Sequence, residues 1–222
     1  MYIIMLGAPG TGKGTIGKIL SEDLSLTHIS TGDMFREQIN KKSELGHQLE
    51  SYMSKGLLVP DDVVIEVVKA RLLEDDVKNG AILDGFPRTA VQAQALKEFL
   101  AEHNPSQKRI AIELKVPDEE IVRRVVNRIT CSNKSCGAIY NIETKPPKIE
   151  GICDICGSEL KRRGDDDEVT VRKRLGVYHQ NAKDLLEFYQ KNNALYSVYP
   201  KELDKAVADI KSHLEMIKAL NV

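Results

Sequence analysis

A glycine-rich segment directly behind a short apolar segment constrains this chain more than any other feature. The apolar residues 2–6 are followed by Gly7-Ala8-Pro9-Gly10-Thr11-Gly12-Lys13-Gly14-Thr15. This order predicts a buried strand, a tight turn and the start of a helix. Glycines let backbone N–H groups surround phosphate oxygens, and the helix N-terminus adds partial positive charge there. The segment predicts a loop that binds a nucleoside triphosphate, with contacts from Gly10, Thr11, Gly12, Lys13, Gly14 and Thr15.

The loop departs from the general pattern at one position. The pattern G-x-x-x-x-G-K-[ST] places Ser or Thr after the lysine, whereas Gly14 stands here and Thr15 follows. A hydroxyl at position 14 therefore cannot coordinate Mg²⁺. Lys13 is still placed to reach the β- and γ-phosphates. The alternative is a glycine-rich turn without a ligand, which the strand–turn–helix context disfavours.

Length and charge exclude several classes of protein. The 222 residues suit one mid-sized domain with an insertion, or two small domains. A net charge of −1 argues against a nucleic-acid-binding protein that works by bulk positive charge. No apolar segment approaches the ~18 residues of a membrane span, and the first residues predict a core strand rather than a signal peptide. We expect a cytoplasmic monomer without nucleic-acid or membrane partners.

Apolar segments alternate with segments of helical spacing along the chain, which is typical of a parallel sheet flanked by helices. The sequence therefore predicts an α/β fold with a five-stranded parallel sheet. Residues 109–114 alternate between polar and apolar types, which indicates a half-exposed strand or one near an edge. The expected strands cover residues 2–6, 26–30, 80–84, 109–116 and 195–199.

Two segments do not fit this alternation. Residues 31–59 have a helical pattern but lie between the second and third strands, and Pro60-Asp61-Asp62 ends them and is expected to cap the next helix. Residues 131–163 are rich in Cys, Lys, Gly and Pro. We expect both segments to lie outside the core and to move over a site.

The four cysteines form two short turns. Cys131-x4-Cys136 and Cys153-x2-Cys156 are separated by 16 residues, and no histidine lies between them. This spacing predicts a tetrahedral all-cysteine Zn²⁺ site. Four protein ligands leave no open position, so the role should be structural. The alternatives are redox-active dithiols, four unrelated thiols or a nucleic-acid-binding finger.

Charged side chains follow the predicted strands. Asp33 and Asp84 come directly after the second and third strands, where ligands gather in open parallel sheets. Arg124 and Arg128 are four residues apart on a predicted helix, which would place them on one face as ligand contacts. Cations for phosphate oxygens and carboxylates for hydrated Mg²⁺ are the groups that phosphoryl transfer needs.

Together these motifs resemble the adenylate kinase family in its long form with a zinc-binding lid. The resemblance extends over essentially the whole chain. Its carriers are the phosphate loop, which in this family also has Gly at position 14, and the segments Ser30-Thr31-Gly32-Asp33-Met34, Asp84-Gly85-Phe86-Pro87-Arg88, Pro146-Pro147-Lys148 and Arg163 to Arg174. The resemblance implies reversible transfer of a phosphoryl group from Mg·ATP to AMP, which gives two ADP. The alternatives are a UMP/CMP or GMP kinase and a zinc-ribbon ATPase that binds nucleic acid.

The resemblance also implies domains and site residues. Residues 1–30, 60–128 and 164–222 would form the core, 31–59 the AMP-binding arm and 129–163 the zinc-binding lid. Asp33 and Asp84 would hold Mg²⁺ through waters, and Asp165 and Asp166 would support the lid arginines. Arg128 would also bind ATP. Catalytic roles fall to Lys13, Arg88, Arg124, Arg128, Arg163 and Arg174, and AMP contacts to Thr31, Arg36, Leu57, Leu58, Val59, Gly85, Phe86, Pro87, Arg88, Gln92, Arg163 and Arg174.

The chain departs from the family's pattern in three places. The first cysteine turn is longer than usual, and Tyr140-Asn141 replaces a frequent Tyr-His. The segment Tyr199-Pro200-Lys201 lacks the Asp-Gly or Asn-Gly turn that helps to seat the adenine of the triphosphate. The sequence therefore leaves the base selectivity of the triphosphate site open.

Overall fold

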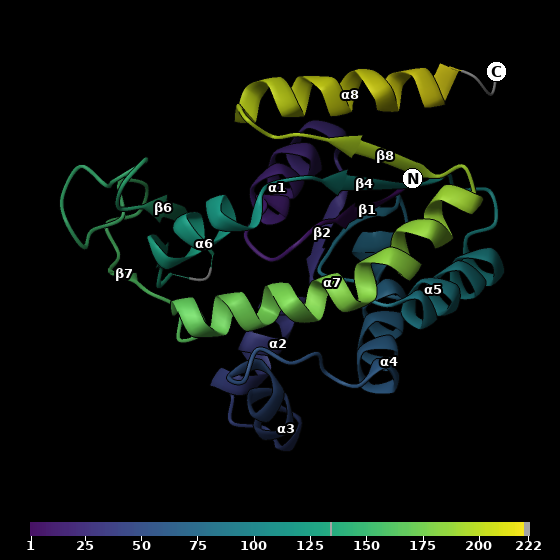
Figure 1. Cartoon of the computed structure of the whole chain (residues 1–222). Coiled ribbons are helices and arrows are strands. Elements are labelled where there is room, and N and C mark those ends of the chain that lie inside the picture. Colours follow the sequence, from purple (N-terminus) through teal and green to yellow (C-terminus); the bar gives the residue numbers. More distant parts are fainter. Residues whose placement is uncertain (134, 220–222) are drawn as a thin grey trace.

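The computed structural model describes residues 1–133 and 135–219. Its main feature is a five-stranded parallel sheet with strand order β2-β3-β1-β4-β8 (Figure 1). This confirms the predicted fold class, and each observed strand lies within a predicted one. The strands are β1 (Tyr2–Leu6), β2 (Thr27–Ser30), β3 (Ala81–Asp84), β4 (Arg109–Leu114) and β8 (Leu195–Val198).

Helices cover both faces of the sheet. Every residue of β1 is buried, and alternate side chains enter two different apolar clusters. Ile3 and Met5 pack toward α1 and α8, whereas Tyr2, Ile4 and Leu6 belong to the cluster of α4, α5 and α7. The helices are α1 (Lys13–Leu24), α2 (Thr31–Asn40), α3 (Glu44–Met53), α4 (Asp61–Leu72), α5 (Ala90–His103), α6 (Asp118–Val126), α7 (Glu168–Lys191) and α8 (Leu203–Ala219), with a 3₁₀ turn η1 (Asp75–Val77).

The expectation that residues 109–114 are half exposed is wrong, whereas the alternative, a place near an edge of the sheet, is confirmed because β4 is next to the edge strand β8. Strand β4 lies between β1 and β8, and residues 110–114 are buried. The two polar residues of the alternating pattern have their own partners. Arg109 donates to the Leu100 carbonyl at 2.7 Å, and the Glu113 carboxylate accepts from Ser197 Oγ at 2.6 Å. A sequence pattern cannot distinguish such paired polar groups from groups that face water.

Two substructures project from the sheet. Helices α2 and α3 follow β2 and lie at the bottom of Figure 1. A small antiparallel sheet with order β6-β5-β7 lies at the left, and α7 runs from it across the molecule. Its strands are β5 (Arg128–Cys131), β6 (Ile139–Asn141) and β7 (Leu160–Lys161). Among the described residues, none of the helices has the length and apolar character needed to span a membrane.

Candidate functional site

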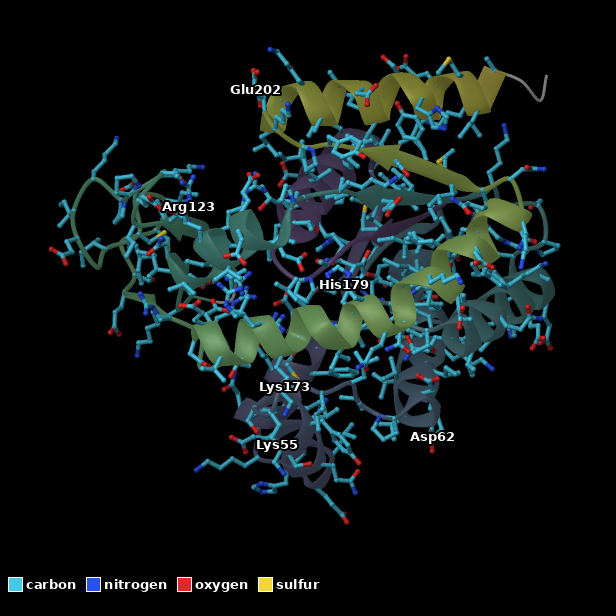
Figure 2. The ribbon with its side chains drawn as sticks, viewed as in Figure 1. Lys55, Asp62, Arg123, Lys173, His179 and Glu202 are labelled. Carbon is cyan, nitrogen blue, oxygen red and sulfur yellow. The ribbon has the colours of Figure 1, made fainter. Side chains whose placement is uncertain are left out.

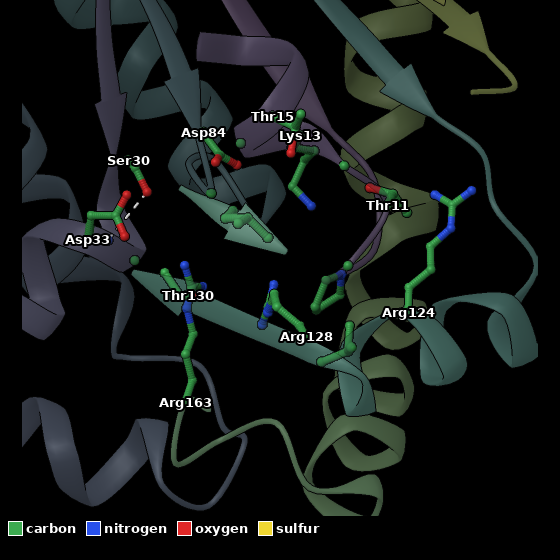
Figure 3. Close-up of a pocket in the computed structure, with 18 of the residues that line it drawn as sticks. Thr11, Lys13, Thr15, Ser30, Asp33, Asp84, Arg124, Arg128, Thr130 and Arg163 are labelled. Carbon is green, nitrogen blue, oxygen red and sulfur yellow. Dashed lines mark hydrogen bonds between the residues drawn. The ribbon is translucent and has the colours of Figure 1, made fainter. Parts of the chain in front are cut away.

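A large cavity lies at the carboxyl ends of β1, β2 and β3. Its volume is about 1240 Å³, above the roughly 300–1,000 Å³ of common small-molecule sites. The loop after β1, the segments after β2 and β3, and residues of the β5–β7 sheet all line it. Figure 3 shows side chains from these separate segments pointing toward a common space. The cavity therefore has room for more than one small-molecule ligand.

Glycines shape the loop after β1. Gly7, Gly10 and Gly12 have φ values of 132°, 91° and 100°, which side-chain-bearing residues rarely adopt. A Cβ at Gly10 would lie 2.3 Å from Val125 Cγ2. A Cβ at Gly14 would lie 3.2 Å from Asp84 Oδ2, so a serine or threonine there would crowd this carboxylate. The departure from the general loop pattern thus leaves space for Asp84.

Lys13 lies at the start of α1 and points into the cavity (Figure 3). Its ammonium donates to the carbonyls of Gly7 at 2.8 Å and Ala8 at 2.7 Å. Desolvation lowers the pKa of Lys13 to about 8, although the nearby Asp84 carboxylate acts in the opposite direction. A phosphate group would favour the charged amine and add negative charge to that of Asp84.

Arginines from four segments line the same cavity, namely Arg88, Arg128, Arg163 and Arg174. Burial and the neighbouring Arg128 lower the pKa of Arg163 to about 10. The Asp165 carboxylate accepts from Arg174 at 2.8 Å, and the fully buried Asp166 accepts two hydrogen bonds from Arg128. Cations held this close together raise the affinity of the cavity for polyanions.

The predicted helical pairing of Arg124 with Arg128 is wrong. Helix α6 ends at Val126, and Arg128 begins strand β5. Arg124 pairs with Glu120 one turn earlier in the helix. In Figure 3, Arg124 lies beyond the phosphate loop from Arg128 and Arg163. Spacing on a helix carried no information about this pair because the helix ends between its two members.

Two carboxylates flank the cavity. Asp84, at the end of β3, lies 4.0 Å from His28 Nε2. Asp33 pairs with Arg36 at 2.6 Å. Burial opposes the ionisation of Asp33, but the charge and hydrogen bond of Arg36 hold its pKa below the usual value. Both side chains are available to waters around a cation.

The residues expected around AMP divide into two groups. The first group lines the cavity and includes Arg36, Leu57, Leu58, Gly85, Pro87 and Arg88. The cavity is also lined by residues expected to have other roles, namely Asp33, Asp84, Asp165 and the loop residues Gly10, Thr11, Gly12, Gly14 and Thr15. Thr31, Val59, Phe86 and Gln92 are buried and lie behind the cavity wall, as does Asp166. Gly85 permits a close approach, since a Cβ there would lie 2.7 Å from Thr31 Oγ1.

The four cysteine sulfurs converge in the small sheet, all within 4.8 Å of one another. Cys131 Sγ lies 3.4 Å from Cys156 Sγ, and Cys136 Sγ lies 3.8 Å from Cys153 Sγ. These distances exceed a disulfide bond of ~2.05 Å. They are close to the sulfur–sulfur separation of about 3.8 Å expected around a tetrahedral ion with bonds of ~2.3 Å. The donor set and its spacing fit Zn²⁺.

The residues that line this cavity include several that sequence reasoning missed, among them His28, Lys18 and Asn141. His28 lies beside Asp84, and its Nε2 is buried without a hydrogen-bond partner in the described part of the chain. Lys18 donates to the Gly137 carbonyl at 3.3 Å, which joins α1 to the first cysteine turn. Asn141, at the position of the missing histidine, donates to the Arg124 carbonyl at 3.1 Å. Of these three, only Asn141 had a signal in the sequence, as a departure from the family's pattern.

Comparisons with known proteins agree with this geometry. A family model described as adenylate kinase matches residues 5–194. The adenylate kinase of Caldicellulosiruptor saccharolyticus is 48% identical over 222 residues, which is 100% of both chains. The adenylate kinase of Thermosipho africanus is 50% identical over 89% of this chain and 91% of its own length. That of Archaeoglobus fulgidus is 48% identical over 99% of this chain and 100% of its own length.

Proposed function

The chain belongs to the adenylate kinase family, and from this premise we propose how its residues carry out the family reaction. That reaction is the reversible transfer of the terminal phosphoryl group from ATP to AMP, which gives two ADP. The chain is therefore a nucleotide-binding phosphotransferase. The observation that carries the assignment of residues is one cavity lined by a phosphate loop with its lysine, by arginines from several segments and by two carboxylates.

The triphosphate binds to the loop after β1. Backbone N–H groups from Gly10 to Thr15 surround the phosphates, Lys13 contacts the β- and γ-phosphates, and Arg128 contacts the same nucleotide. Family members use Mg·ATP as substrate. Asp33 and Asp84 would hold its Mg²⁺ through waters, where the ion would supply positive charge against the phosphate oxygens. The space that Gly14 leaves beside Asp84 supports this assignment.

Catalysis depends on position and charge, without a covalent intermediate. Lys13, Arg88, Arg128, Arg163 and Arg174 stabilise the charge on the transferring phosphoryl group. Asp165 and Asp166 orient Arg174 and Arg128 and do not act as bases, which their hydrogen bonds support. Arg124, which also lines the cavity, contributes to the same stabilisation.

AMP binds on the opposite side of the cavity. Arg36, Arg88, Arg163 and Arg174 contact its phosphate, and residues 57–59 and 85–87 lie near its nucleoside. Thr31 and Gln92, both buried, contribute to this site from behind the wall. Residues 31–59 form the arm that closes over AMP, and 1–30, 60–128 and 164–222 form the core. Closure excludes water, which would otherwise accept the phosphoryl group.

Residues 129–163 form a lid that is stabilised by Zn²⁺ on Cys131, Cys136, Cys153 and Cys156. When bound, the ion supplies folding energy to a segment whose own buried cluster is small, namely Cys131, Tyr140, Cys153 and Leu160. Elemental analysis of the purified protein tests this assignment directly. One zinc per chain is expected, and its loss after all four cysteines are changed to serine. A chain isolated without metal, with its full melting temperature, would contradict it.

The proposal includes the setting of the enzyme. It works as a monomer in the cytoplasm, in nucleotide biosynthesis, without nucleic-acid or membrane partners, and four clustered free thiols are consistent with a reducing compartment. A coupled assay for ADP formation with AMP, GMP, CMP and UMP as acceptors tests the central assignment. AMP should give the highest kcat/KM. Failure of AMP as acceptor, or no heat of binding with a dinucleoside pentaphosphate, would refute it.

A further inference from the structure

The sequence predicted a cap for α4 that the structure does not contain. Helix α4 begins at Asp61 as expected, but its N-cap is Pro60 and no side-chain hydrogen bond caps it. The Asp61 carboxylate turns instead toward the start of α5. Its Oδ1 accepts from Gln92 Nε2 at 2.7 Å, and its Oδ2 accepts from Thr89 Oγ1 at 2.9 Å. An acidic residue in a first helical turn ordinarily serves the helix itself, so this carboxylate has another role.

The two hydrogen bonds determine how the groups beyond them are oriented. Since Gln92 Nε2 donates to Asp61, Gln92 Oε1 faces the other way and accepts the backbone N–H of Arg88 at 2.8 Å. Thr89 gives its hydroxyl hydrogen to Asp61, so its oxygen accepts the backbone N–H of Gln92 at 3.2 Å and caps α5. Gln92 is 1% exposed, so no water replaces these partners readily.

The network ends at the backbone N–H of Arg88. The side chain of Arg88 is held separately, since its Nε donates to the Gly85 carbonyl at 2.7 Å. Pro60 alone separates Asp61 from the arm, and Leu57 and Leu58 at the end of the arm line the same cavity as Arg88. A set of hydrogen bonds therefore joins the first residue of α4 to the backbone of an arginine on the acceptor side.

We propose that Asp61 is a positioning residue for the acceptor nucleotide, which acts through Gln92 and Thr89 to hold Arg88. The inference rests on the proposed assignment of Arg88 to AMP. Asp61 is not among the residues that line the cavity. Its loss should weaken the acceptor side and leave the phosphate loop unchanged, because no part of the network reaches residues 7–15.

The adjacent Asp62 offers a matched control. It has the same charge, lies in the same first turn of α4 and is exposed, pointing away from the body of the molecule (Figure 2). Asp61→Ala should raise KM for AMP about tenfold, the effect expected when a half-buried, charged hydrogen-bond acceptor is lost. KM for ATP should change by less than about twofold. The two effects are easy to tell apart, because a tenfold change in KM corresponds to 1.36 kcal/mol and a twofold change to much less. Asp62→Ala should change neither KM value.

Two further variants separate positioning from folding. Asp61→Asn keeps the shape of the side chain and the oxygen that accepts from Gln92, so its KM for AMP should be close to the wild-type value. This variant remains informative if Asp61→Ala fails to fold. The double variant Asp61→Ala/Gln92→Ala should be no worse than Gln92→Ala alone, because both changes remove the same support of Arg88. Melting temperatures of the zinc-loaded proteins are recorded alongside.

The inference would be overturned if Asp61→Ala raised both KM values equally or left the KM for AMP unchanged. It would also be overturned if Asp61→Ala and Asp62→Ala had equal effects, or if the losses in the double variant were additive. If no variant that lacks the Asp61 carboxylate changes the ratio of the two KM values, the residue is structural only. Wild-type protein that forms no ADP from ATP and AMP would instead refute the proposed function. The two failures are therefore distinguishable in one set of assays.

Discussion

Replacing Lys13 with methionine should remove most of the activity and little of the stability. The change preserves the length and apolar stem of the side chain and removes its ammonium. In the structure that ammonium is half-buried, and it donates to the carbonyls of Gly7 and Ala8 at 2.8 and 2.7 Å. Two opposing effects on the free energy of unfolding follow from this position.

The first effect favours the variant. Desolvation lowers the pKa of Lys13 from 10.5 to about 8, which at 1.36 kcal/mol per pH unit is roughly 3 kcal/mol against the protonated amine at neutral pH. This penalty applies below about pH 8, where the amine is charged in both folded and unfolded chains, and it fades as pH rises toward 10.5. The second effect opposes the variant, since two hydrogen bonds from a charged donor are worth about 1.5–3 kcal/mol each. The two partly cancel, which leaves a net destabilisation of about 0–3 kcal/mol.

Turnover has no such compensation. Loss of one donor to a developing charge lowers kcat by about 10²–10³-fold. The assays are coupled ADP formation and thermal unfolding, in which the upper limit of about 3 kcal/mol corresponds to roughly 6–12 °C for a chain of this size. Lys205→Met, which removes an exposed lysine paired with Glu202, serves as the control. Near-normal turnover in Lys13→Met, or loss of activity that only follows loss of fold, would refute the role of the loop lysine.

Three other outcomes are expected. The kcat/KM for ATP should fall above about pH 8 as free Lys13 loses its proton, and Lys13→Arg should shift this limb to higher pH; an identical profile would contradict the assignment. Asp166→Ala should lower the free energy of unfolding by about 3 kcal/mol and lower kcat, because it leaves Arg128 without its buried partner. The control, Asp167→Ala, removes only a helix cap worth about 1 kcal/mol. Equal kcat values for the two variants would contradict the role of the Arg128–Asp166 pair. Zinc chelation should lower the melting temperature more than the rate at 25 °C, and the reverse ranking would indicate a catalytic metal.

Local patterns were sufficient wherever one segment forms the whole feature. The phosphate loop depends on a strand, three glycines with positive φ and a helix start within 15 residues, so its sequence determines its geometry. The cysteine turns were predictable for the same reason, although their convergence depended on the pairing of β5 with β6 and β7. Strands β1 and β3 were predictable because they are short apolar segments that are buried along almost their whole length.

Patterns failed where a side chain meets a distant partner. Residues 109–114 alternate like a half-exposed strand, yet Glu113 is buried because Ser197, 84 residues away, donates to it. Arg124 and Arg128 have helical spacing, yet the helix ends between them. Asp61 looks like a helix cap, yet it holds Gln92, 31 residues away. In each case the partner is near in space and remote in the chain.

The sequence by itself determined that this chain builds a parallel α/β sheet with a phosphate loop and a four-cysteine cluster. These features follow from the φ values of glycine, the burial of short apolar strands and the spacing of thiols, all of which act over a few residues. Only the tertiary structure decided which arginines share the cavity and which carboxylates orient them. It also decided which of the residues predicted to contact AMP are buried and do not line the cavity. Those choices depend on where helices end and which segments pack together, and such long-range packing leaves no periodic trace in the sequence.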